Sequence, residues 1–257
     1  MKDVAWSYTR LSLYETCPHA YYKRYIEGKR GPQSAYTQWG ILMHDLLELN
    51  ASGKLSSADM IDAYRQQFDE VVTADFPQWF SSSDVREEYY KAGIGFLFAY
   101  NGVPEHWQVL QHEWTINTTI GDGCKLTGRL DLLARDKATD ELILLDYKSK
   151  KQFRSRKEEA LQLRQLYLYA KGVQECYGKF PDKLDFLLLR SNQLREHSFD
   201  AQAYGATLAW AADIAKQASS DIFWEYDADR RRERGLTSVA SYCKLLCDYR
   251  HDCEALI

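Results

Sequence analysis

Residues 126–149 read LTGRLDLLARDKATDELILLDYKS, two strand-like runs rich in apolar residues on either side of a polar turn. Successive side chains of a β-strand point to opposite faces, so this pattern predicts two antiparallel strands joined by a hairpin. With the turn centred between Ala138 and Thr139, the numbers of opposed residues add to 277, and Asp131 faces Asp146. Alternation also assigns to the face of Asp131 three further residues of its strand, which are Thr127, Arg129 and Leu133.

Two opposed carboxylates on neighbouring strands predict a cation site. Opposed side chains lie ~5 Å apart at Cβ, and like charges there destabilise a sheet unless a cation neutralises them. Mg²⁺ and Mn²⁺ prefer oxygen ligands and retain water, so Asp131, Asp146 and the backbone carbonyl of Tyr147 would suffice. Lys148 shares the face of Asp146, where an ammonium can orient water or stabilise charge on a phosphoryl group. The alternative is an exposed ion pair of Asp146 and Lys148 at the strand end, with Asp131 as a turn residue.

The rest of the chain predicts an α/β fold around this hairpin. Apolar residues recur at helical spacing on both sides of a central region of alternating residues, which begins near Trp107. We therefore expect a central mixed sheet flanked by helices. The expected helices cover residues 8–30, 34–50, 57–74, 84–100, 157–177 and 202–219, and the expected strands lie within 107–149 and near 184–190 and 194–199.

The composition fits a globular protein. Of 257 residues, 45% are hydrophobic and 14% aromatic, with only 14 Gly and 5 Pro, which excludes low-complexity and collagen-like classes. The net charge of -4 excludes binding to nucleic acid through the overall field of the protein, although a local basic run is present. That run consists of Lys148, Lys150, Lys151, Arg154, Arg156 and Lys157. No apolar signal segment or membrane span is evident, so we expect a soluble cytoplasmic protein without a membrane partner.

Four of the six cysteines form a pattern. Cys243, Cys247 and Cys253 lie close together near the C-terminus, and Cys17 lies near the other end. Four thiolates can bind a 4Fe-4S cluster or a tetrahedral Zn²⁺ ion, and unligated thiols are a third possibility. Cys124 and Cys176 stand apart and are expected to be small buried residues.

Five motifs occur in an order that resembles the PD-(D/E)XK nuclease superfamily. Within it, the chain is similar to the RecB-type exonuclease group, which includes the CRISPR-associated iron-sulfur exonuclease and the AddB nuclease domain. The motifs are Cys17-Pro18, Gly40-x-x-x-His44, Gly128-x-x-Asp131, Asp146-Tyr147-Lys148 and Gln165-x-x-x-Tyr169, followed by the C-terminal cysteines. The proline of the superfamily's name is replaced by Leu130, which removes no ligand.

The resemblance assigns roles to individual residues. It implies a restriction-endonuclease-like fold in which His44, Asp131 and Asp146 bind a divalent metal and Lys148 is the catalytic lysine. Glu113 precedes Asp131 on the neighbouring strand and is either an additional outer carboxylate or an ordinary exposed strand residue. Gln165 and Tyr169, one helical turn apart, would contact DNA or position Lys148. The resemblance favours an iron-sulfur cluster on Cys17, Cys243, Cys247 and Cys253, although three residues separate Cys243 from Cys247 where the family more often has two.

These assignments together predict a Mg²⁺- or Mn²⁺-dependent deoxyribonuclease. By resemblance, we expect an exonuclease that hydrolyses phosphodiester bonds at single-stranded DNA ends, with Lys151, Arg154 and Arg156 along the DNA backbone. The expected organisation is a single elaborated domain over 1–257, with a helical insertion at about 50–105, a nuclease core at about 106–220 and a clasp formed by 17 and 243–253. The alternative function is that of a DNA-end-processing subunit of a CRISPR adaptation or recombination complex.

Overall fold

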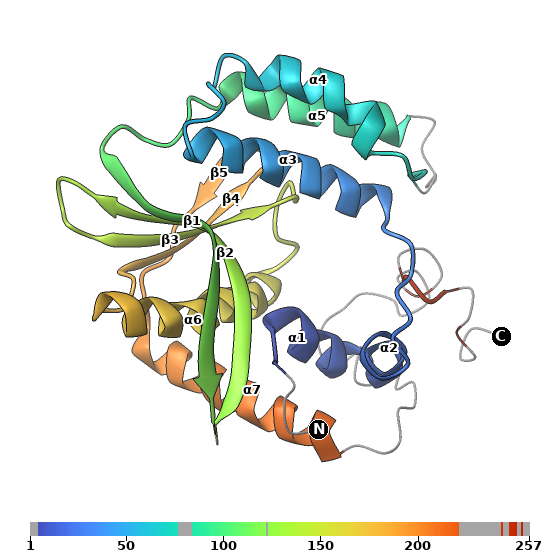
Figure 1. Ribbon diagram of the computed structural model, residues 1–257, viewed down its shortest axis with the longest axis vertical. Helices are drawn as coiled ribbons and strands as arrows, with labels where there is room; N and C mark the ends of the chain where they lie inside the picture. The colour runs from blue at the N-terminus through green and yellow to red at the C-terminus, as the bar shows by residue number, and fades with distance from the viewer. Residues whose placement is uncertain are drawn as a thin grey trace.

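The computed structural model describes residues 5–76, 84–121, 123–220, 243, 247–250 and 253. Its centre is a five-stranded mixed sheet with the order β1-β2-β3-β4-β5. Helices lie on both faces of this sheet, with α3, α4 and α5 on one side and α6 and α7 on the other (Figure 1). The expected α/β class, with a central mixed sheet flanked by helices, is therefore confirmed.

The strands lie close to the predicted ranges. The sheet consists of β1 (Trp107–Ile120), β2 (Cys124–Asp136), β3 (Leu142–Lys148), β4 (Lys183–Leu188) and β5 (Gln193–Arg195). The observed β2–β3 pairs run from Leu132–Leu145 to Arg135–Leu142, which is the predicted register. Because a slip of one residue would exchange the two faces, this register determines where the site residues point.

A parallel crossover unit follows the hairpin. The strand β3 pairs in parallel with β4, and such pairing requires a long connection, which here is helix α6 (Arg156–Tyr177). Ser155 caps the start of α6 by accepting a hydrogen bond from the backbone N–H of Glu158 at 3.1 Å. Gly178, with a φ of 76°, ends the helix in the left-handed conformation that glycine adopts without strain.

The remaining helices differ from the expected ranges mainly at their ends. They are α1 (Tyr8–Thr16), α2 (Pro18–Tyr21), the π-helix η1 (Tyr22–Ile26), α3 (Ala35–Ala51), α4 (Met60–Val71), α5 (Val85–Ala99) and α7 (Ala201–Ser220). The expected helix at 8–30 is divided at Cys17, which is extended and caps α2. The expected strand at 194–199 is regular only over β5, with one further bridge between Lys183 and Ser198.

Two apolar clusters fix the helices on the sheet. One contains Leu133 and Leu144 with residues of α6 and α7, and the other contains Leu132 and Leu145 with residues of α3, α4 and α5. Leu130 lies in the same cluster as Leu133, so the strict alternation predicted for Thr127 to Leu133 is wrong in this strand. The cause lies on the neighbouring strand β1, where Glu113 has a φ of 45°, which distorts the pleat. The residues on either side of Glu113 pair regularly, His112 with Leu132 and Trp114 with Leu130.

Two smaller expectations also need correction. Cys176 is exposed and Cys124 is only partly buried, so neither is the buried residue that its isolation in the sequence suggests. Cys176 lies in the last turn of α6, and the apolar face of that helix is formed by other residues such as Leu166 and Val173.

In the part of the chain that the structure describes, no helix combines the length and apolar character needed to cross a membrane.

Candidate active site

His44 projects from α3 toward the edge of the β2–β3 hairpin. Its Nε2 atom lies 3.1 Å from the backbone carbonyl oxygen of Tyr147, and its Nδ1 atom lies 3.6 Å from Oδ1 of Asp131. If Nε2–H donates to the carbonyl, the lone pair of a neutral imidazole remains on Nδ1, facing the carboxylate side. The backbone carbonyl of Tyr147 therefore orients the ring of His44, and it also lies at the cation site predicted from the sequence.

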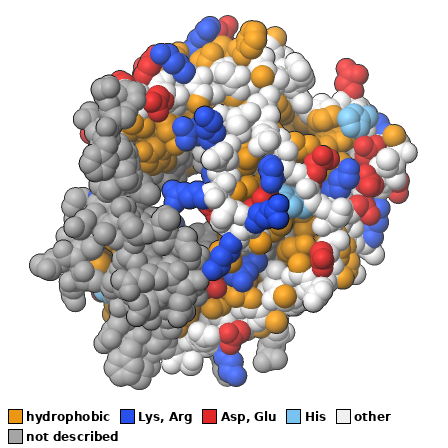
Figure 2. All heavy atoms as spheres, turned by 180° about the vertical axis from the view of Figure 1, so that it is seen from behind, with side chains coloured by type: hydrophobic (Ala, Val, Ile, Leu, Met, Phe, Trp, Pro, Cys, Tyr) orange, Lys and Arg blue, Asp and Glu red, His pale blue; other side chains and the backbone are white. Residues whose placement is uncertain are grey.

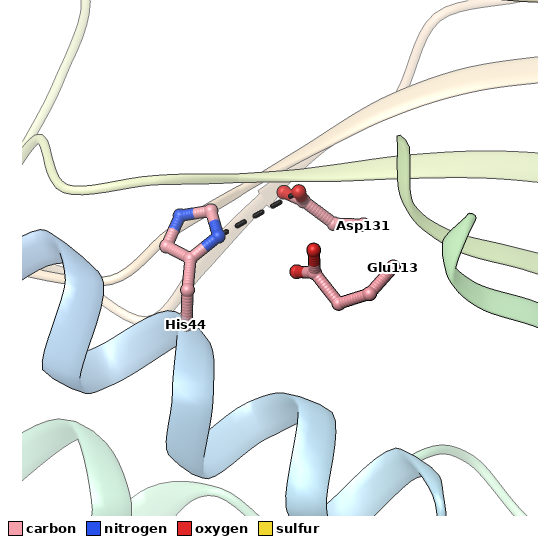
Figure 3. A group of neighbouring side chains, drawn as sticks. All are labelled: His44, Glu113 and Asp131. Atoms are coloured by element: carbon pink, nitrogen blue, oxygen red, sulfur yellow. Dashed lines mark ion pairs between the residues drawn. The ribbon is translucent and has the colours of Figure 1, made fainter. Parts of the chain in front are cut away.

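Three side chains from three elements converge at this point. Ligand atoms of His44, Glu113 and Asp131 lie within 4.8 Å of one another, with the two carboxylates directed toward the imidazole (Figure 3). Asp131 is fixed by the backbone N–H of Tyr147, which donates to its Oδ2 at 2.6 Å. Glu113 is held in a backbone conformation that is rare for a non-glycine residue, and such strain clusters at functional sites.

Asp146 and Lys148 lie next to this group on β3. Lys148 Nζ is 2.8 Å from Oδ2 of Asp146 and donates to Oε1 of Gln165 at 2.8 Å. Gln165 Nε2 in turn donates to the hydroxyl of Tyr169 at 3.1 Å. The ring of Tyr169 packs so closely on Gly128 that a Cβ atom there would lie 2.1 Å from its Cε1 atom. One chain of contacts therefore links β3 through α6 back to β2.

Burial and mutual repulsion govern the charges at the site. Burial and the neighbouring Asp131 raise the pKa of Asp146 to about 6, although Lys148 opposes this shift. Burial and Asp131 likewise raise the pKa of Glu113 to about 7, against the effect of Arg129. Burial favours neutral His44, but Asp131, Asp146 and Glu113 together outweigh it and raise the pKa of His44 to about 9. The site thus concentrates negative charge, which a cation would stabilise.

The donor set fits a divalent metal ion. Oδ2 of the buried Asp146 has the ammonium group of Lys148 at 2.8 Å as its counter-charge and makes no hydrogen bond to any other described residue. One imidazole nitrogen with several carboxylate oxygens suits Mn²⁺ and also Mg²⁺, and imidazole shifts the balance toward Mn²⁺. Asp146 is not within the close group of three, whereas Glu113, assigned from sequence only as an outer carboxylate, is a member of it.

A second charged group borders the site. Arg129 forms ion pairs with Glu113 and with Glu48, the latter at 3.8 Å, and His112 approaches Glu48 at 3.9 Å. Glu48 lies one turn after His44 on α3, which brings it to the same face. The sequence argument missed Glu48 and left Arg129 without a role, because their proximity depends on how α3 crosses β1 and β2.

The basic run after β3 lies at the surface. Lys151, Arg154 and Arg156 are exposed, whereas Lys150 is paired with Glu158 at 2.5 Å. On the face opposite to that of Figure 1, Lys and Arg side chains gather over the middle of the molecule (Figure 2).

The four patterned cysteines line one cavity. Cys17, Cys243, Cys247 and Cys253 border a cavity of about 300 Å³ together with residues of α1 and α2. Burial and the three other thiols raise the pKa of Cys247. Two contacts join the C-terminal and N-terminal residues here without any bound group. Tyr249 donates a hydrogen bond to the backbone carbonyl of Lys29 at 3.0 Å, and Arg24 lies 4.0 Å from Asp248.

Comparison with known proteins identifies the family. The sequence profile of the PD-(D/E)XK nuclease superfamily matches residues 5–254, nearly the whole chain. The chain belongs to the PD-(D/E)XK nuclease superfamily. No curated protein sequence matches it significantly.

Two solved structures are weakly similar to the chain. A protein from Eubacterium rectale described as a candidate exonuclease is 11% identical, with a TM-score of 0.49 over 89% of this chain and 87% of that one. A protein named SSO0001 is 14% identical, with a TM-score of 0.38 over 100% of this chain and 89% of that one. Because both TM-scores lie below 0.5, membership of the superfamily rests on the profile match.

Proposed function

We propose that the protein is a metal-dependent DNA exonuclease that acts on single-stranded ends. The observation that carries this proposal is the convergence of His44, Glu113 and Asp131 beside Asp146 and Lys148, in a chain of the PD-(D/E)XK nuclease superfamily. Members of that superfamily cleave nucleic acid with divalent metals, and the acidic site described above suits such an ion.

His44, Asp131 and Asp146 are the proposed protein ligands of Mn²⁺ or Mg²⁺. Glu113 is added to this set because its carboxylate reaches the same point as His44 and Asp131. When bound, a divalent cation polarises a phosphoryl oxygen and lowers the pKa of water. The carbonyl of Tyr147 would orient His44, and its second lone pair is free to accept a further contact.

Lys148 is the proposed catalytic lysine. Contacts to Asp146 and Gln165 hold its ammonium group within hydrogen-bonding distance of both, and only 14% of its side chain is exposed. A cation fixed in this way can stabilise the negative charge that develops on the phosphoryl group without reorganisation of solvent. Gln165 and Tyr169 are the proposed positioning residues.

Lys151, Arg154 and Arg156 are the proposed contacts to the DNA backbone. They are exposed and follow β3 directly, so phosphates that lead away from Lys148 would meet them next. Neutralisation of phosphates by basic side chains releases counterions, which makes such binding sensitive to salt.

A 4Fe-4S cluster is the proposed occupant of the cysteine-lined cavity. Tetrahedral zinc holds its thiolates about 3.8 Å apart, as its Zn–S bonds of about 2.3 Å require. No three of these four sulfur atoms form a group within 4.8 Å in the described residues. A cluster of four irons and four sulfides lies between its thiolates and holds them farther apart, which supports the cluster over zinc.

Labelled DNA tests the proposed function. Single and double strands labelled at either the 5′ or the 3′ end are incubated with the purified protein in Mg²⁺, Mn²⁺ or chelator. We expect release of short products from single strands, beginning at the 5′ end, and no products in chelator. A circular single strand should remain intact, since an exonuclease requires an end. Cleavage of that circle, or degradation in chelator, would contradict the proposal.

A further inference from the structure

Arg129 is a basic residue at the metal site that the proposed mechanism does not use. It lies on β2 two residues before Asp131, and its Nε atom contacts Oε2 of Glu113 while its Nη2 atom lies 3.8 Å from Oε2 of Glu48. The two carboxylates are largely covered, with 11% and 32% of their side chains exposed, but 61% of the Arg129 side chain is exposed. A covered acidic pair therefore anchors a guanidinium whose other side faces solvent.

Stability alone does not account for this arrangement. Ion pairs of exposed side chains contribute little to folding, and the guanidinium is the exposed member of both pairs. No hydrogen bond from Nη1 of Arg129 is found in the part of the chain that the structure describes, and the ion-pair contacts are made by Nε and Nη2. Arginine presents several N–H groups in a planar fork that matches two oxygens of a phosphate.

The position of Arg129 suits a phosphate near the metal. Glu113, which contacts the guanidinium, also lies within 4.8 Å of His44 and Asp131 through its carboxylate. The opposite side of the site carries Lys148 and the basic run, whereas acidic side chains surround the β2 side. Among the described residues that form ion pairs with Glu48 or Glu113, only Arg129 carries a permanent positive charge. A DNA strand that crosses the site would therefore meet this cation on the β2 side, beyond the carboxylates.

We infer that Arg129 is a further substrate-binding residue, which holds a backbone phosphate of the DNA strand on the β2 side of the metal site. The inference rests on the proposed function. It adds a second point of attachment across the site from Lys151, Arg154 and Arg156, so that the strand is held on both sides of the scissile bond. Glu113 and Glu48 position the guanidinium from behind.

DNA binding in the absence of cleavage tests this role. The variant Lys148→Ala serves as background, and affinity for a fluorescent single-stranded oligonucleotide is measured in Mn²⁺ at several salt concentrations. Adding Arg129→Ala should weaken binding about tenfold and reduce the salt slope by about one. Arg129→Lys keeps the charge but not the fork, and should weaken binding by a smaller factor. Arg135→Ala is the matched control, because Arg135 lies on the same strand but pairs with Asp140 in the hairpin turn at 3.0 Å.

Mn²⁺ binding and thermal unfolding separate this role from a structural one. Arg129→Ala should bind Mn²⁺ at least as tightly as its background, because Glu113 loses a competing partner. Unchanged DNA affinity and salt slope in both Arg129 variants would overturn the inference while leaving the nuclease proposal intact. Equal losses of Mn²⁺ and DNA binding in both variants would also overturn it in favour of a structural role. If the Lys148→Ala protein with Arg129 intact does not bind DNA, and the wild type is inactive, the proposed function is rejected instead.

Discussion

Asp131 illustrates how one side chain serves both the fold and the site. One carboxylate oxygen accepts the backbone N–H of Tyr147, and the other faces His44. The first contact joins β2 to β3 beyond their last regular pair at Leu132 and Leu145. The second places a charged oxygen among the proposed metal ligands. A substitution that preserves one contact and removes the charge can therefore separate the two roles.

The first prediction concerns Asp131→Asn. The amide can still accept from Tyr147, so we expect a folded protein with a thermal midpoint close to that of the wild type. Loss of the charge should weaken Mn²⁺ binding and lower activity at least ~10²-fold, since ligand charge holds the ion. Calorimetric titration with Mn²⁺ and a DNA degradation assay measure the two effects. The control is Asp140→Asn in the exposed hairpin turn, and equal activity of both variants would contradict the assignment.

A second prediction concerns the support of Lys148 by Gln165. In Gln165→Leu, the ammonium loses its acceptor at 2.8 Å and the link to Tyr169. We expect kcat to fall about tenfold with Mn²⁺ affinity unchanged, because the lysine becomes less well positioned. If Gln165 instead contacted DNA, KM would rise and kcat would be nearly constant. Gln162→Leu, one turn earlier on α6, provides the control.

At the scale of elements, the β2–β3 hairpin is where sequence reasoning succeeded. The polar turn between two strand-like runs defines a register with few alternatives, and four observed pairs follow it, although the alternation of faces fails within β2. The same reasoning failed at Glu113, because a left-handed residue within a strand leaves no mark in hydrophobic alternation. It could not place Glu48 or Arg129 either, since the approach of α3 to β1 is a tertiary contact between distant segments.

The contact between β2 and α6 gives the third prediction. A methyl group at Gly128 would overlap the ring of Tyr169, with 2.1 Å between Cβ and Cε1. Gly128→Ala should therefore destabilise the protein by about 1–3 kcal/mol and lower kcat by displacing Tyr169 and Gln165. Denaturant unfolding and steady-state kinetics measure these effects. Gly95→Ala on α5 is the control, since a methyl group there would meet no described residue within 4 Å outside its own stretch of helix, and alanine favours a helix.

At the scale of the whole molecule, the cysteine cavity joins the two ends of the described chain. Cys17 lies between α1 and α2, whereas Cys243, Cys247 and Cys253 come after α7. A common metal group would close a loop of most of the chain, and loop-closure entropy makes such a link most effective for long loops. The sequence indicated this grouping through the close spacing of the three C-terminal cysteines and, for Cys17, through the family resemblance, but neither determined which metal group the thiols bind.

The fourth prediction follows from this closure. Protein purified without oxygen should be brown and contain about four irons per chain, as a Cys₄-bound 4Fe-4S cluster requires. Cys17→Ala should lose the iron and unfold at a lower temperature, whereas Cys176→Ala should keep both, because Cys176 is exposed and outside the cavity. Iron and zinc analysis with thermal unfolding measures the outcome. Colourless protein with one zinc per chain would reject the cluster, and a Cys17 variant that retains full iron would reject the clasp.

The central claim is that the carboxylates and His44 hold a divalent ion and that Lys148 acts beside it on DNA. The most direct measurement follows single-stranded DNA degradation and Mn²⁺ binding in the same samples of wild-type protein and Lys148→Ala. The account predicts that both proteins bind Mn²⁺, that the wild type alone degrades DNA, and that chelator abolishes its activity. Lys183→Ala is the control and should behave as wild type, because it removes a partly exposed ion pair with Glu141 at the first residue of β4, whereas Lys148 lies beside the last residue of that strand. Full activity of Lys148→Ala, or of metal-free wild type, would contradict the account.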